Sequence, residues 1–138
     1  MSLEWREQLS VGNDLIDSDH KYLIGLINRI EESMATMNRG QLTEGLDSLS
    51  RYSLTHFALE EKIADGVHYP QIPRLHESHE ALLGKLEQVR QELDEDWTPT
   101  SIEHFIALLR AWLINHVIKE DLLMKPFLSK RSPSFDPR

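Results

Sequence analysis

Four stretches of this sequence place apolar residues at alternating steps of three and four, the spacing of one buried face of an α-helix. The stretches run from about residue 18 to 37, 43 to 64, 72 to 93 and 100 to 127, and turn-forming residues separate them. Short connections between helices make neighbours antiparallel. No stretch shows the period of two that a half-buried strand needs. The sequence therefore predicts an all-α fold, an antiparallel up-down-up-down four-helix bundle with an extended N-terminal segment.

The chain length and the ends of these stretches predict how the chain is organised. With 138 residues the chain is long enough for one domain with a sizeable core. We expect the bundle to cover residues 1–129. The segment 130–138 contains two prolines, two serines and one large apolar residue, and we expect it to be a flexible tail or a linker.

Composition excludes several classes of function. The 15 basic and 23 acidic residues give a net charge of −8, which disfavours nucleic acid and anionic membranes as partners. No apolar run approaches the roughly 18 residues that span a bilayer, so we expect a cytoplasmic protein. There is no cysteine, which excludes disulfides, iron–sulfur clusters and thiolate nucleophiles. Any bound metal must therefore have nitrogen and oxygen ligands.

Several polar residues fall on the apolar stripes, where burial costs several kcal/mol unless they are paired or bind a metal. A lone histidine there is usually a satisfied core residue, but here every helix contributes at least one, and an antiparallel bundle brings them near one end. Four imidazoles and two carboxylates exceed the ligands of a structural zinc site and fit two first-row metals. The candidate ligands are His20, His56, Glu60, His79, His116 and Asp121.

The spacing of the last two candidates is unusual. His116 and Asp121 are five residues apart, which in an ideal α-helix turns Asp121 about 140° away from the face of His116. A π-type turn or a long reach would bring both to one centre. On helical geometry alone, Glu120 remains an alternative to Asp121.

The chain also resembles a known family, the hemerythrins, in its bacterial branch. The resemblance extends from residue 5 to about residue 128. It rests on the following segments: Trp5, Val11-Gly12, Ile16-Asp17-Ser18-Asp19-His20, His56-Phe57-Ala58-Leu59-Glu60-Glu61, Tyr69-Pro70, His79-Glu80-Ala81, and Trp112-Leu113-Ile114-Asn115-His116 followed by Asp121.

The resemblance implies a cofactor of two iron ions, bridged by an oxo or hydroxo group when oxidised. It implies that His20 and His56 bind one iron, that His79 and His116 bind the other, and that Glu60 and Asp121 bridge them. The family has a further histidine where this chain has Leu75. The helical spacing places Leu75 on the inward face and His76 about 100° around the helix from it. This favours the interpretation that the chain has lost that ligand. Replacement of the ligand by His76 is the alternative.

The function expected from this resemblance is O2 binding by a protein that is not itself an enzyme. We expect an oxygen or redox sensor that is the input module of a signalling protein, with an output domain beyond the C-terminus and with nitric oxide or another small ligand as an alternative signal. The competing interpretations are a di-iron enzyme that oxidises ferrous iron or turns over peroxide, and a protein that stores or buffers iron. A zinc or manganese occupant is a further alternative.

Overall fold

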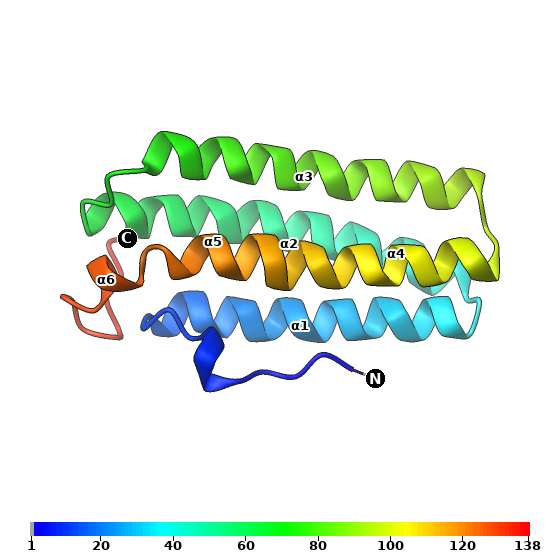
Figure 1. Ribbon diagram of the computed structural model, residues 1–138, viewed down its shortest axis with the longest axis horizontal. Coiled ribbons are helices and arrows are strands. Elements are labelled where there is room, and N and C mark those ends of the chain that lie inside the picture. The colour runs from blue at the N-terminus through cyan, green and yellow to red at the C-terminus, as the bar shows by residue number, and fades with distance from the viewer. Residues whose placement is uncertain (1) are drawn as a thin grey trace.

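The computed structural model describes residues 2–138, and its long helices pack side by side as an antiparallel bundle (Figure 1). The elements in chain order are η1 (Glu7–Leu9), α1 (Asp14–Ala35), α2 (Arg39–Gly66), α3 (Ile72–Glu95), α4 (Pro99–Ala111), η2 (Trp112–Ile118), α5 (Lys119–Leu122) and α6 (Lys125–Leu128). Helix α4, the π-helical η2 and α5 together form the fourth member of the bundle. The predicted all-α four-helix bundle is confirmed.

Two helices begin earlier than the sequence predicted, because asparagine side chains cap them. Oδ1 of Asn13 accepts hydrogen bonds from the backbone N–H groups of Leu15 and Ile16, so α1 starts at residue 14. The predicted cap at Asp17 or Ser18 is wrong, since Asp17 lies inside the helix and accepts a hydrogen bond from the N–H of Val11. Asn38 likewise caps α2, where the sequence predicted a turn up to residue 40.

The bundle core consists of two apolar clusters. The larger one fills most of the bundle and includes Leu23, Phe57 and Leu82; the smaller one closes the end where α2 and α3 are joined and includes Ile16 and Leu75. Along α1, His20 lies between Ile16 of the smaller cluster and Leu23 of the larger one. Along α3, His79 lies between Leu75 and Leu82 in the same way. The polar candidates therefore occupy a layer between two apolar regions, where water is excluded.

The C-terminal segment folds back onto the same end of the bundle. The backbone N–H of Asp14 donates to the carbonyl of Pro133 at 2.8 Å, and the amide of Asn13 donates to the carbonyl of Phe135 at 3.1 Å. The Phe135 ring lies against the end of α2 at Gly66. The sequence predicted a flexible tail here, and it gave no sign of these contacts because Phe135 is an isolated apolar residue. Among residues 2–138, no helix is long and apolar enough to cross a membrane.

Candidate metal centre

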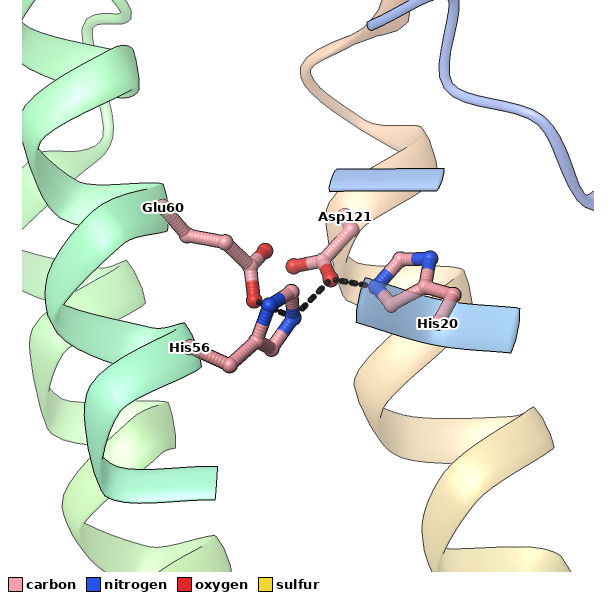
Figure 2. Close-up of side chains that lie close together, drawn as sticks. All are labelled: His20, His56, Glu60 and Asp121. Atoms are coloured by element: carbon pink, nitrogen blue, oxygen red, sulfur yellow. Dashed lines mark hydrogen bonds and ion pairs between the residues drawn. The ribbon is translucent and has the colours of Figure 1, made fainter. Parts of the chain in front are cut away.

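Four buried side chains from three parts of the chain meet inside the bundle (Figure 2). His20 comes from α1, His56 and Glu60 from successive turns of α2, and Asp121 from α5. One nitrogen or oxygen atom of each lies within 4.8 Å of those of the other three. Each of these residues is at most 1% exposed. Ligands that share one first-row metal ion lie about 3 to 3.5 Å apart, so this cluster needs only small shifts to bind a cation.

Several polar atoms of the cluster lack hydrogen-bond partners among the residues described. Nε2 of His56, both carboxylate oxygens of Glu60 and Oδ1 of Asp121 are buried without a hydrogen bond among the residues described. Nε2 of His56 lies 2.5 Å from Oε1 of Glu60 but outside hydrogen-bond geometry. Leaving a buried polar atom unpaired costs about 1–3 kcal/mol. A bound cation would satisfy these atoms together, which is the strongest physical sign of a metal site here.

Carboxylates outside the cluster orient the imidazoles of His56, which belongs to it, and of the neighbouring His79. Nδ1 of His56 donates to Asp19 at 2.8 Å, and the Tyr52 hydroxyl donates to the other oxygen of Asp19 at 2.5 Å. Nδ1 of His79 donates to Glu61 at 3.0 Å. With the proton on Nδ1, each ring presents Nε2 as a ligand, the arrangement found around metal-binding histidines. Sequence reasoning gave Asp19 and Glu61 no role, although each directly adjoins a candidate ligand in the chain.

The charges of the cluster favour bound protons when no cation is present. Burial raises the pKa of Glu60 well above its usual value, and the nearby charge of Asp121 raises it further. Burial alone would lower the pKa of His56, but Glu60, Asp121 and Asp19 raise it well above its ordinary value. Burial also opposes ionisation of Asp121, yet its neighbours Glu60 and His20 hold the pKa of that carboxyl below its usual value. A cation entering the site must therefore displace protons.

His79 lies next to this cluster. It is 2% exposed, its Nε2 lies 3.9 Å from Oε1 of Glu60, and that nitrogen has no hydrogen-bond partner among the described residues. The Phe57 ring stacks on the imidazole with the ring centres 4.1 Å apart and fixes its plane. His79 therefore faces the same carboxylate from α3 and can complete a second cation position.

Leu75 and His76 lie as the helical rhythm predicted. Leu75 is 1% exposed and belongs to the smaller apolar cluster, whereas His76 is exposed and its Nδ1 lies 2.7 Å from Glu61. His76 therefore supports Glu61 rather than reaching the four-residue cluster.

His116 is not brought to the cluster. The π-helical η2 turns Val117 and Ile118 into the core and leaves His116 exposed, in a groove between α3 and η2 that Leu82 and Lys119 also line. The sequence left a π-type turn or a long reach as the ways to bring His116 and Asp121 to one centre; the structure has a π-helical turn, Trp112–Ile118, but its His116 stays exposed. Asp121 is the carboxylate at the cluster, and Glu120 lines the groove.

Comparisons with known proteins agree with this geometry. The family model described as "Hemerythrin HHE cation binding domain" matches residues 11–128. A bacteriohemerythrin of Pseudomonas aeruginosa is 30% identical over 122 residues, which cover 86% of this chain and 76% of that protein. A bacteriohemerythrin of Stenotrophomonas maltophilia is 27% identical with the same coverage, and a myohemerythrin of Riftia pachyptila is 24% identical over 82% of each chain. A crystal structure of wild-type hemerythrin superposes with a TM-score of 0.76 at 24% identity, covering 92% of this chain and 98% of that one.

The donor set decides which cofactor fits. Imidazole nitrogens and carboxylate oxygens suit first-row cations such as iron, and two carboxylates buried side by side need positive charge between them. The expected di-iron cofactor agrees with the cation-binding domain whose family model matches this chain, and with the nitrogen and oxygen ligands of the cluster. The cluster of four residues could hold one cation, which would leave Glu60 and Asp121 one oxygen each for a second cation beside His79.

Proposed function

This chain belongs to the hemerythrin HHE cation-binding family, and from that premise we propose that its bundle holds two iron ions and binds O2 reversibly. His20 and His56 bind the first iron, His79 binds the second, and Glu60 and Asp121 bridge them. His116 is the remaining ligand of the second iron if its side chain turns inward from the groove. The unpartnered lone pairs that converge between two apolar clusters carry this proposal.

The chain's own residues prepare the centre for this ligand. When bound, a reduced iron pair supplies the electrons that O2 takes up. Asp19 and Glu61 hold the imidazoles of His56 and His79 with Nε2 facing the carboxylates. The two apolar clusters exclude water, which favours reversible binding of an uncharged diatomic ligand over hydrolytic chemistry. No nucleophile with an adjacent base accompanies these residues in the described centre, so we propose a binding protein rather than a hydrolase.

We further propose that the chain is the input module of an oxygen or redox sensor in the cytoplasm. The support is Leu75, which leaves the second iron position short of a nitrogen ligand and open to an exogenous molecule. With Leu75 in that place, the residues of the second position would leave part of its coordination open to a small molecule, and such a centre suits detection better than long-term carriage of O2. Nitric oxide fits the same open position.

Iron reconstitution followed by visible spectra tests the proposal. The expected result is two irons per chain and a spectrum that changes when air is admitted and returns when O2 is removed. Glu60→Gln should abolish this spectrum because it removes a bridging carboxylate, whereas His104→Gln, at an exposed residue, should leave it unchanged. Steady consumption of peroxide without a reversible oxygenated spectrum would indicate an enzyme instead. One zinc per chain would exclude the di-iron centre.

A further inference from the structure

We propose that the two cation positions of this centre differ widely in affinity, so that the first iron is held firmly and the second exchanges with free ferrous ions. This inference rests on the proposed function and adds a form of regulation to it. The two positions differ in how many ligands they can draw from the residues that the structure brings together.

The first position has a full set of protein ligands. Two imidazoles and two carboxylates surround it, with Nε2 of His20 2.6 Å from Oδ2 of Asp121 and Nε2 of His56 3.8 Å from the same oxygen. All four residues are buried, and Asp19 orients His56. Four charged or strongly polar ligands in a dry site bind a first-row cation tightly.

The second position has fewer ligands. Once the first cation is bound, the unpaired atoms left to bind a second one are Nε2 of His79, one oxygen of Glu60 and Oδ1 of Asp121; Nδ1 of His20 is also unpaired, but its ring already binds the first cation. Each of the two carboxylates is then shared between two cations. The position therefore has one nitrogen ligand of its own, and water must complete its coordination.

Nothing nearby in α3 or η2 supplies another ligand without rearrangement. Leu75, one turn before His79, is apolar and packed in the smaller cluster. His76 is exposed and bound to Glu61. His116 is exposed in the groove, and the π-helical turns of η2 would have to shift before its ring could reach Asp121.

The missing nitrogen ligands lower the affinity of the second position. A single change in the surroundings of a ligand costs 10–100-fold in metal affinity, so the absence of a whole imidazole ligand should cost at least about 100-fold. Repulsion from the first cation lowers the affinity further. A site with one imidazole and shared carboxylates also favours harder ions, ferrous or manganous, over copper or zinc.

The functional consequence is that O2 binding by the iron pair depends on the supply of free ferrous iron. At low iron the chain holds one cation and lacks the pair that O2 requires. At higher iron the second position fills and the centre responds to O2. The chain would then respond to O2 only when free ferrous iron is also available.

Graded removal of iron from the loaded, full-length chain tests this inference. The protein is loaded with excess ferrous iron without air, equilibrated with increasing concentrations of a chelator, desalted, and analysed for metal by mass spectrometry. We expect the iron content to fall from two per chain to a plateau at one, and then to zero, with midpoints at least about 100-fold apart in chelator concentration. Adding manganous ion to the one-iron form should restore a second metal.

Two variants assign the steps to their residues. His79→Ala should bind one iron with the same second midpoint, because only the weaker position loses its ligand. Leu75→His should bring the midpoints closer together by adding a nitrogen ligand one turn from His79. His104→Ala is the matched control at an exposed histidine, and circular dichroism confirms that each variant is folded.

The outcomes separate this inference from the proposed function. Loss of both irons in one step, or loss of all iron binding in a folded His79→Ala variant, would overturn the unequal positions while leaving the di-iron centre intact. A wild-type chain that binds no iron at all would overturn the proposed function and this inference with it.

Discussion

Asp19 is a partly buried carboxylate that holds His56, a proposed metal ligand, in place. It accepts hydrogen bonds from both His56 and Tyr52, and these hydrogen bonds lower the pKa of its carboxyl although burial acts in the opposite direction. Asp19→Asn removes the negative charge that stabilises the His56 ring with its Nδ1 proton. We expect a 10–100-fold loss of affinity for the first iron, measured by competition with a coloured chelator.

Asp14→Asn is the control for this substitution, because Asp14 begins the same helix, is exposed and has no side-chain contact with the centre. Equal affinities in the two variants would show that Asp19 does not orient His56.

Proton release should accompany metal uptake, because Glu60 and His56 both have a pKa raised well above the usual value. A raised pKa means that each group keeps its proton to a higher pH than usual, so the metal-free protein binds protons that the first cation must displace. We expect the first cation to release roughly one to two protons and to bind more tightly as pH rises from 6 to 8. An indicator dye in weak buffer measures the release. Affinity that stays constant over this pH range would contradict the prediction.

At the scale of the elements, η2 decides what His116 does. The side chain of His116 is exposed in the groove, and that of His104 on α4 is exposed outside it. Both should therefore react readily with an imidazole-modifying reagent in metal-free protein. If His116 is a ligand of the second iron, metal loading should reduce its modification at least several-fold and leave His104 unchanged. Peptide mass spectrometry gives the extent at each residue. Equal modification before and after loading would exclude His116 as a ligand.

The sequence predicted the bundle well and the centre in part, for different physical reasons. Apolar periodicity records which face of each helix is buried, so His20, His56, Glu60 and His79 were placed inward correctly. The start of α1 was misjudged because several polar residues near it can cap a helix, and only the fold shows that Asn13 does so. The outward position of His116 could not be predicted, since the location of a π-type turn depends on packing rather than on periodicity.

Glycines test how closely α1 and α2 approach. A Cβ atom added to Gly45 on α2 would lie 2.9 Å from Cγ1 of Ile30, a fully buried residue of α1, whereas one added to Gly84 on α3 would meet nothing within 4 Å. Gly84→Ala should raise the free energy of unfolding by about 0.5–1 kcal/mol through helix propensity. Gly45→Ala should lower it by about 1 kcal/mol or more, because the close contact outweighs that gain. Urea unfolding of both variants gives the comparison, and equal stabilisation would show that the helices can separate at no cost.

At the scale of the whole molecule, the polar centre lies near one end of the bundle. The start of α1, the end of α2 and the C-terminal segment meet at that end. That segment holds the start of α1 through Asn13 and Asp14, only a few residues before His20. Arg131 adds a hydrogen bond from its guanidinium to the carbonyl of Gly66 at the end of α2. The C-terminal segment therefore closes the end of the bundle nearest the candidate metal centre.

Phe135 is the residue on which this closure depends. Its ring packs against Gly66 and the smaller apolar cluster, and the Arg131 guanidinium lies 5.2 Å from the ring centre. Phe135→Ala should lower the free energy of unfolding by about 1–2 kcal/mol, less than for a fully buried phenylalanine because the ring is only half-buried. Asp136→Ala is the matched control, since among the described residues the Asp136 side chain bonds to Arg138 alone, at the exposed chain end. Urea unfolding of the metal-free chain measures both, and a Phe135→Ala variant as stable as the wild type would mean that the segment is the flexible linker that its sequence predicts.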